Sequence, residues 1–219
     1  MVSKRYDRAY FDKWYRDPRH AVNSWHELER KVALAVATAE YYLGRRIVNV
    51  LDVACGEGVW RGPLRRLRPR IDYLGLDSSE YVVARYGRSR NLRLARFGDL
   101  GHQRFDHGFD LIVCADALHY VRAGELRRGL RGIAEMLDGA AFLELFTAAD
   151  DPAGDRRGFI ARSPRWYLRE FRDAGLIPCG SHCYIGPRLE GRVAALEVPV
   201  EIASVNAMSS AGQHTGVEA

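Results

Sequence analysis

Apolar and polar residues alternate along the chain with two periods, one typical of strands and the other of helices. Five short apolar runs suit buried strands, and they lie at 47–53, 71–77, 92–97, 109–114 and 140–146. Patterns with helical spacing fill the intervals near 59–68, 79–87 and 122–137. Because strands that alternate with helices pair in parallel through crossover connections, the pattern predicts an open α/β sheet with helices on both faces.

The last part of the chain departs from this alternation. A helical pattern at 164–175 is followed by two strand-like runs, 177–185 and 193–200. Only 186-GPRLEG-191 joins these runs, which is too short for a crossover and predicts an antiparallel hairpin. The sheet is therefore expected to be mostly parallel, with an antiparallel strand at one edge. The polar segment 147–164 has the length typical of a lid or a binding loop.

The first part of the chain predicts two helices. Residues 24–44 begin with Ser24 and Glu27, a capping box, and end at Gly44. Before them, residues 8–17 carry an aromatic stripe at helical spacing, made up of Tyr10, Phe11, Trp14 and Tyr15. Such a stripe either packs the helix onto the sheet or caps a bound ligand, and the sequence leaves both possibilities open.

A glycine-rich turn follows the first predicted strand, within 50-VLDVACGEGVW-60. A strand that leads through such a turn into a helix presents backbone N–H groups to a ligand. A dinucleotide site would need a third glycine for close helix packing, but Gly62 falls one place late for G-x-G-x-x-G. Asp52 and Glu57 lie beside the turn, where two carboxylates would repel a pyrophosphate. The turn therefore favours a cofactor that carries positive charge and no phosphate.

Acidic residues also end the next two predicted strands. Asp77 stands nineteen residues after Gly58, where an acid can accept two hydrogen bonds from a ribose diol or cap the following helix. Asp99, in 97-FGDL-100, can accept the exocyclic amine of adenine with Leu100 against the ring, or serve only in a turn. Because the carboxyl ends of parallel strands meet at one edge of a sheet, these acids predict a single nucleoside-binding site.

These residues resemble the class I S-adenosylmethionine-dependent methyltransferases over 45–200. The family's glycine motif matches 50-VLDVACGEG-58, with Ala54 where glycine is commoner, and its ribose and adenine motifs match 74-LGLDSS-79 and 98-GDL-100. The resemblance implies a Rossmann-like seven-stranded sheet in the order 3-2-1-4-5-7-6, with strand 7 antiparallel. It also implies S-adenosylmethionine as the cofactor, bound by Tyr15, Asp52, Ala54, Cys55, Gly56, Gly58, Asp77, Ser78, Gly98, Asp99, Leu100, Cys114 and Ala115.

The segment 109-FDLIVCADALHYV-121 matches the part of the family that faces the methyl group and the acceptor. Members that methylate amide or adenine nitrogens usually carry Asn/Asp-Pro-Pro-aromatic here, and this segment has no proline. The resemblance therefore implies direct in-line transfer to an O or N of a small molecule. His119 is the best candidate for a general base, with Asp116 and His182 as weaker ones, although His119 can equally be a structural residue at a helix start.

The resemblance also suggests how the chain is divided. Residues 1–45 are expected to form an N-terminal helical cap, 46–202 the methyltransferase domain, and 203–219 a disordered tail. An inactive methyltransferase-like domain that serves as a binding module is a second interpretation, because the acceptor site has no obligatory residue.

Net charge and arginine clusters bear on the choice of partner. The chain has a net charge of +5 and a pI near 9.1. Arginine-rich segments at 65–70 and 127–131 could contact an anionic polymer, which makes an RNA methyltransferase a further alternative. Both fall on predicted helices with acidic residues interspersed, so solvated helix faces are favoured and nucleic acid is not expected as a partner. The arginines of 147–164 would permit an acidic acceptor.

Targeting and metal signals are weak in this sequence. No stretch approaches ~20 consecutive apolar residues, and the first residues lack the apolar core of a signal peptide, so a cytoplasmic protein without membrane contact is expected. Cys179 and Cys183 with His182 provide at most three soft ligands, at a spacing outside the common zinc pattern, and no metal site is predicted.

Overall fold

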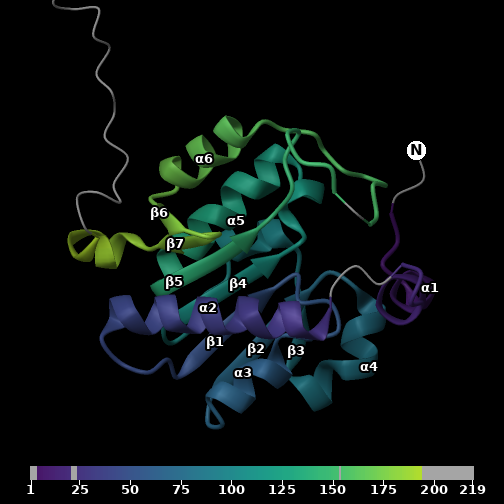
Figure 1. Ribbon diagram of the computed structural model, residues 1–219, viewed down its shortest axis with the longest axis horizontal. Coiled ribbons are helices and arrows are strands. Elements are labelled where there is room, and N and C mark those ends of the chain that lie inside the picture. Colours follow the sequence, from purple (N-terminus) through teal and green to yellow (C-terminus); the bar gives the residue numbers. More distant parts are fainter. Residues whose placement is uncertain (1–3, 21–23, 153, 194–219) are drawn as a thin grey trace, which may run out of the picture.

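The computed structural model describes residues 4–20, 24–152 and 154–193. Within these residues one seven-stranded sheet has the order β3-β2-β1-β4-β5-β7-β6 (Figure 1). The strands are β1 Asn49–Val53, β2 Asp72–Asp77, β3 Leu92–Leu94, β4 Phe109–Ala115, β5 Leu137–Glu144, β6 Ile177–Gly180 and β7 Cys183–Ile185. Strands β1 to β5 pair in parallel, whereas β7 is antiparallel to both β5 and β6. The predicted strand order and its antiparallel seventh strand are confirmed.

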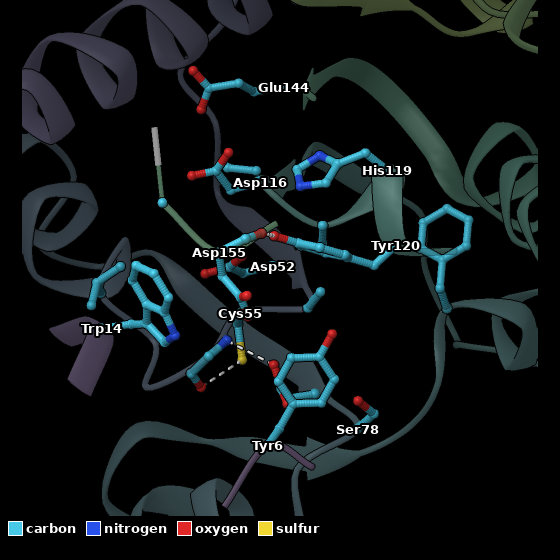
Figure 2. A pocket seen from close by; sticks show the side chains of 18 of the residues that line it. Tyr6, Trp14, Asp52, Cys55, Ser78, Asp116, His119, Tyr120, Glu144 and Asp155 are labelled. Atoms are coloured by element: carbon cyan, nitrogen blue, oxygen red, sulfur yellow. Dashed lines mark hydrogen bonds between the residues drawn. The ribbon is translucent and has the colours of Figure 1, made fainter. Parts of the chain in front are cut away.

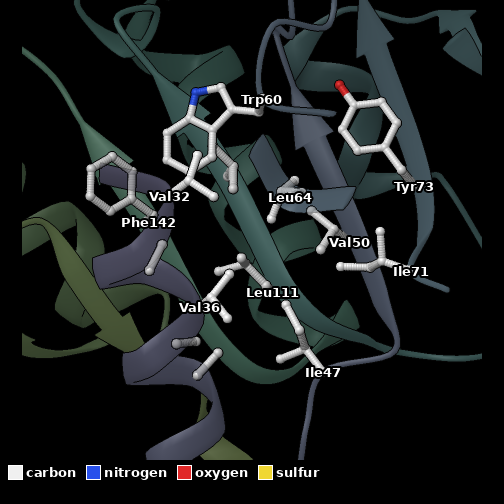
Figure 3. Packing of buried hydrophobic residues seen from close by; sticks show 14 of the residues in the cluster. Val32, Val36, Ile47, Val50, Trp60, Leu64, Ile71, Tyr73, Leu111 and Phe142 are labelled. Carbon is white, nitrogen blue, oxygen red and sulfur yellow. The ribbon is translucent and has the colours of Figure 1, made fainter. Parts of the chain in front are cut away.

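Helices cover both faces of the sheet, as predicted. One apolar cluster joins the sheet to α2 (Trp25–Leu43), α3 (Arg61–Leu67) and α4 (Glu80–Arg90) through residues such as Val32, Leu64 and Val82. Figure 3 shows the α2 and α3 side chains of this cluster packed against Val50 and Leu111 of the strands. A second cluster, on α5 (Ala123–Met136), α6 (Pro164–Asp173) and the 3-10 turn η2 (Phe97–Gly101), fills the other face. Burial of both faces explains why the central strands read as continuous apolar runs.

Helix α2 packs directly against the sheet and does not form part of a separate cap. Its first turn is capped by the Ser24 hydroxyl, which accepts from the Glu27 N–H over 3.1 Å, and it ends at Gly44 with φ +69°. Val32, Ala35 and Ala39 of the helix are fully buried in the core. The boundary expected at residue 45 stays a prediction, because both residues 4–20 and the first turns of α2 reach the carboxyl edge of the sheet.

Residues 8–17, expected to form one helix, form two short pieces. Helix α1 (Arg8–Phe11) begins at Asp7, whose carboxylate accepts from the Tyr10 N–H over 3.1 Å. A π-helical turn, η1 (Asp12–Arg16), follows and closes with a bond from the Asp17 N–H to the Asp12 carbonyl. Wider turns of this kind re-aim the side chains that they carry and are frequent at functional sites.

The predicted hairpin between 177–185 and 193–200 is placed wrongly. The first run folds back on itself as β6 and β7, and its two turn residues, Ser181 and His182, have φ of +47° and +66°. Two consecutive positive φ values make a type I′ turn, which matches the twist of a two-residue hairpin. The expected turn at 186–191 is instead mostly the 3-10 turn η4 (Pro187–Arg192). Residues 194–200, and the predicted tail 203–219, lie outside the described residues.

Candidate active site

A cavity of about 670 Å³ opens over the carboxyl ends of β1, β2 and β4. Side chains of residues 4–20, called the N-terminal segment below, line it on one side. Pro152, Gly154, Asp155 and Phe159 of the loop 147–163 line it on another. This edge is where open α/β sheets bind ligands, and the volume suits a small molecule or cofactor. Eleven predicted site residues line the cavity: Tyr15, Asp52, Ala54, Cys55, Gly56, Asp77, Ser78, Gly98, Ala115, Asp116 and His119.

Four predicted cofactor residues, Gly58, Asp99, Leu100 and Cys114, lie outside the wall of the cavity. Leu100 and Cys114 are fully buried in the apolar cluster beneath it. Gly58, with φ +71°, shapes the glycine turn. The Asp99 carboxylate accepts from the Arg96 N–H over 2.8 Å and so stabilises η2, the turn role that the sequence had left open. The preceding residues, Ala95 to Gly98, line the cavity where Asp99 was expected to do so.

The glycine turn is tied to the end of β2 by Asp77. The Gly56 N–H donates to Asp77 Oδ2 over 2.8 Å, and the Ser79 N–H donates to Oδ1 over 2.8 Å. Burial raises the pKa of Asp77, and these backbone donors oppose the increase. An ionised carboxylate has about four lone-pair sites, so each Asp77 oxygen keeps capacity for a hydroxyl donor in the cavity.

Asp52 is a buried carboxylate held by a tyrosine of the neighbouring strand. Its side chain is 2% exposed, and the Tyr73 hydroxyl donates to its Oδ2 over 2.6 Å. Burial raises the pKa of Asp52 to about 7; the Tyr73 hydrogen bond opposes this increase and the charge of Asp77 adds to it. Sequence reasoning missed Tyr73. The available signal was a tyrosine inside a buried strand, because a buried phenol usually has a hydrogen-bond partner.

Glu57 does not act on the cavity in the way that the sequence suggested. Its carboxylate pairs with Arg16 of the N-terminal segment, with 2.6 Å between Nη2 and Oε1, and it lies outside the cavity wall. The negative charge beside the turn therefore comes from Asp52 and Asp77 rather than from Asp52 and Glu57. Arg16 and Glu57 instead fasten the N-terminal segment to the turn.

The aromatic stripe packs on the glycine turn and also lines the cavity. The Tyr15 hydroxyl approaches Gly56 so closely that a Cβ at this glycine would collide with it. The Ser79 hydroxyl donates to the Tyr6 carbonyl over 2.5 Å, which secures the segment to the start of α4. Tyr10, Phe11 and Trp14 complete this wall. The stripe therefore packs on the turn and lines the cavity, and its capping of a bound ligand stays a prediction.

A second set of contacts joins the N-terminal segment to the loop 147–163. Lys4 Nζ lies 2.8 Å from the Asp155 carboxylate and 3.5 Å from the centre of the Tyr120 ring. The Tyr120 hydroxyl donates to the Asp155 carbonyl, and Figure 2 shows Asp155 and Tyr120 side by side at the cavity. Residues of this loop thus line the cavity, and its role as a lid or a binding loop stays a prediction. Nothing in the local sequence around Lys4 or Asp155 indicated that they would pair.

His119 lines the cavity from a buried position. Its side chain packs against the rings of Tyr120, Phe146 and Phe159, and the residue is 2% exposed. Burial lowers the pKa of His119 to about 4, and the charge of Lys4 adds to this effect. The Phe146 N–H donates to Nδ1 over 3.3 Å, which leaves the proton of the neutral ring on Nε2. His119 therefore presents a hydrogen-bond donor, and its predicted role as a base stays a prediction.

The cysteine pair and the weaker base candidate lie elsewhere. Cys179 and Cys183 are in the β6–β7 hairpin with His182 in its turn, and His182 lies outside the cavity wall. The four cysteines all lie within the described ranges, and none of them forms a disulfide bond. No group of three or more His, Cys, Asp or Glu residues within the described ranges is arranged to hold a metal ion. In the same ranges, no helix is long and apolar enough to cross a membrane.

The fold is an α/β sheet protein with a cavity at the carboxyl edge of its sheet. Residues 51–142 match the sequence model of a methyltransferase domain. A search of curated proteins finds no match to this chain. The 3-2-1-4-5-7-6 strand order is the one that the resemblance to class I S-adenosylmethionine-dependent methyltransferases implied, and the matched residues run from β1 into β5 of this sheet.

Solved structures share this fold at low sequence identity. The sugar N-methyltransferase KedS8 from Streptoalloteichus sp. ATCC 53650 is 17% identical over 73% of this chain and 87% of its own, with a TM-score of 0.57. An S-adenosylmethionine-dependent methyltransferase from Clostridium acetobutylicum is 16% identical over 81% and 95%, with a TM-score of 0.55. The [4+2]-cyclase SpnF is 23% identical over 77% and 63%, with a TM-score of 0.53.

Proposed function

We propose that the protein transfers the methyl group of S-adenosylmethionine to an O or N of a small-molecule acceptor by direct in-line displacement. One observation carries this proposal: two buried carboxylates, Asp52 and Asp77, flank the glycine turn in one part of a cavity that continues past His119. The first part suits a cationic nucleoside, and the second leaves room for an acceptor. The match of residues 51–142 to a methyltransferase domain supports methyl transfer as the reaction type.

The residues of the cavity fit the cofactor by charge and by hydrogen bonding. Asp52 is suited to the ammonium group and Asp77 to the ribose diol, because both are acceptors when ionised. The aromatic rings of Tyr10 and Trp14 are suited to a sulfonium, since cations bind to ring faces. The same two buried carboxylates would repel a pyrophosphate, which disfavours NAD or a nucleotide sugar.

When bound, S-adenosylmethionine supplies a methyl group that its sulfonium has already activated. The chain then has to align the acceptor and exclude water. The N-terminal segment is held over the cavity by the Arg16–Glu57 and Lys4–Asp155 ion pairs, and in this position it can exclude water from the cavity. The His119 Nε2–H can hold an oxygen or nitrogen lone pair of the acceptor in place.

The position of the basic segments favours a small acceptor over RNA. The arginines of 65–70 and 127–131 lie on α3, on the loop that follows it and on α5, outside the cavity wall. Arg127 is paired with Glu170 on the face formed by α5 and α6. An RNA that followed these arginines would not be led to the methyl-transfer site.

Calorimetry with S-adenosylmethionine tests the cofactor assignment. The wild type is expected to bind one equivalent, and Asp77→Asn to bind about 10- to 100-fold more weakly, because hydrogen bonds to charged groups contribute roughly 1.5–3 kcal/mol. Asp72→Asn is the matched control, since Asp72 is exposed at the opposite end of the same strand. A folded wild-type protein that does not bind the cofactor would contradict the proposal, and cofactor binding without any methyl transfer would favour the binding-module alternative.

A further inference from the structure

Aromatic side chains are concentrated around the cavity. The chain has 8 Phe, 4 Trp and 11 Tyr residues, and 11 of these line the cavity, against three Leu or Val residues within the described ranges. By contrast, the two apolar clusters that fill the faces of the sheet are mostly aliphatic. The aromatic residues thus gather where a ligand would bind rather than in the core.

One group of these rings belongs to the cofactor end of the cavity. Tyr15 contacts Gly56 of the glycine turn, and the Tyr6 carbonyl accepts from the Ser79 hydroxyl, close to Asp77. The packing of the N-terminal segment and the proposed cofactor explain the position of this group. The chemistry of the acceptor has to be inferred from the other rings.

A second group of rings surrounds His119, and Figure 2 shows His119 on the side of the cavity opposite Tyr6. Phe146 and Phe159 line the cavity and are partly buried, and the centroid of each ring lies 5.5 Å from that of the imidazole. The Phe146 N–H donates to His119 Nδ1 over 3.3 Å. The N–H of Ile160, which follows Phe159, donates to the His119 carbonyl over 2.9 Å. The backbone therefore holds both rings in place before a ligand arrives.

The start of α2 adds a further ring at this end. Lys31 Nζ lies 2.8 Å from the Glu144 carboxylate, which places the first turns of α2 beside the end of β5 and close to Phe146. Trp25 lines the cavity and is 51% exposed, with the Arg66 guanidinium 4.9 Å from its ring centre. A large ring that stays half exposed at a cavity gains further apolar contact when a ligand covers it.

The chemical group that suits these three side chains best is a flat aromatic ring. Aromatic rings attract one another in offset-stacked or edge-to-face arrangements, which strengthen binding by roughly 2- to 10-fold for each ring pair beyond the burial of apolar area. A saturated ring of equal size gains the burial alone, because it has no π system. The wall therefore favours an aromatic ligand over a saturated one of the same shape.

We propose that the methyl acceptor is a small aromatic molecule, bound with its ring against Phe146, Phe159 and Trp25. This inference rests on the proposed function and narrows its acceptor to one chemical class. The Nε2–H of His119 lies within the same group of rings and can donate to an oxygen or nitrogen carried by the acceptor. Such a hydrogen bond fixes the rotation of the bound ring, while the surrounding side chains fix its tilt.

Two neutral amides of nearly the same shape test this inference. Benzamide and cyclohexanecarboxamide differ only in the ring, and each is titrated into wild-type protein saturated with S-adenosylhomocysteine and followed by ligand-observed NMR. Benzamide is expected to bind at least about fivefold more tightly. In Phe146→Leu/Phe159→Leu, which keeps apolar side chains and removes both rings, the preference should fall below about twofold. Phe105→Leu is the matched control and should keep the wild-type preference, because Phe105 is partly buried and lies outside the cavity wall.

The outcomes separate this inference from the proposed function. Equal binding of the two amides, tighter binding of cyclohexanecarboxamide, failure of benzamide to bind, or an unchanged preference in the double variant would each overturn the aromatic assignment. Trp25→Leu provides a second variant if the double variant unfolds, because Trp25 is half exposed, and it should lower the preference in the same direction. Failure of the folded wild type to bind S-adenosylhomocysteine would instead contradict the cofactor site itself.

Discussion

Replacing Tyr73 by phenylalanine removes one buried hydroxyl and tests how the protein holds a charge at Asp52. The hydroxyl donates to Asp52 Oδ2 over 2.6 Å, and both residues are 2% exposed. Burial raises the pKa of Asp52 to about 7, and the hydroxyl keeps it from rising further. An ammonium group of the cofactor would interact with the ionised form, so Tyr73 acts as a positioning residue for the cofactor.

The size of the effect follows from the hydrogen bond. A hydrogen bond to a charged group contributes about 1.5–3 kcal/mol, and one pH unit of pKa corresponds to ~1.36 kcal/mol. Tyr73→Phe should therefore raise the pKa of Asp52 by about one to two pH units. The ionised fraction at pH 7 would fall from about one half to roughly 1–10%, and cofactor affinity at that pH by about 5- to 50-fold.

The sign of the stability effect is fixed by the direction of the pKa shift. Because the pKa of Asp52 is raised in the folded state, the folded protein binds the proton more tightly than the unfolded chain does. The free energy of unfolding therefore falls as pH rises from the ordinary aspartate range towards the folded pKa. In Tyr73→Phe this decrease should extend to higher pH, which urea unfolding at several pH values would measure.

Calorimetry in two buffers of different ionisation enthalpy is the decisive assay for Tyr73, since it counts the protons released on cofactor binding. At pH 7 the variant should release close to half a proton more than the wild type, because more of its Asp52 starts protonated. Tyr184→Phe, which removes a partly buried hydroxyl on β7 away from the cavity, is the control. Wild-type affinity and wild-type proton release in Tyr73→Phe would show that the Tyr73 hydroxyl does not control the ionisation of Asp52.

Three further substitutions test the charge state of His119, the Lys4–Asp155 ion pair and the close contact at Gly56. Burial lowers the pKa of His119 to about 4, so the folded protein loses stability as the pH falls below the ordinary histidine range. In His119→Gln, the decrease in the free energy of unfolding between pH 7 and pH 5 should therefore be about 2 kcal/mol smaller than in the wild type. Equal decreases in the two proteins, measured by urea unfolding, would argue against a buried neutral imidazole. Lys4→Met should increase the rate of cofactor release several-fold in stopped-flow measurements, because it removes the ion pair with Asp155. Adding Asp155→Asn should increase that rate little further, and additive effects of the two substitutions would show that the ion pair does not slow cofactor release. Gly56→Ala should destabilise the protein by about 1–2 kcal/mol, and less in a Tyr15→Phe background, because the collision is with the Tyr15 hydroxyl; identical thermal shifts in both backgrounds would exclude that collision.

The parallel part of the fold was predictable because each strand carries its own signal. The runs that became β1, β2 and β4 are short, apolar and followed by helical patterns, which indicates burial on both faces. The edge hairpin was misplaced because its turn, Ser181-His182, lacks the glycine or asparagine that usually marks two positive φ values. The π-helical turn at Asp12–Arg16 likewise has no local sequence signature.

The candidate site was predictable where position in the chain fixes position in the fold. Asp52 and Asp77 end neighbouring parallel strands, so their meeting at one edge follows from the strand order. Partnerships between distant segments had no such constraint. Glu57 was assigned to the cavity because Arg16 could not be placed beside it from sequence. Glu144 lines the cavity and was missed, because its pairing with Lys31 joins segments that are far apart in the chain.

The most direct test of the central claim is a crystal structure of the protein grown with S-adenosylhomocysteine. We expect density for the ligand across the glycine turn, with its ribose hydroxyls at Asp77 and its amino group at Asp52, in contact with residues 4–20. Ligand density at another place, or a fully occupied ligand whose ribose and amino groups contact neither carboxylate, would contradict it.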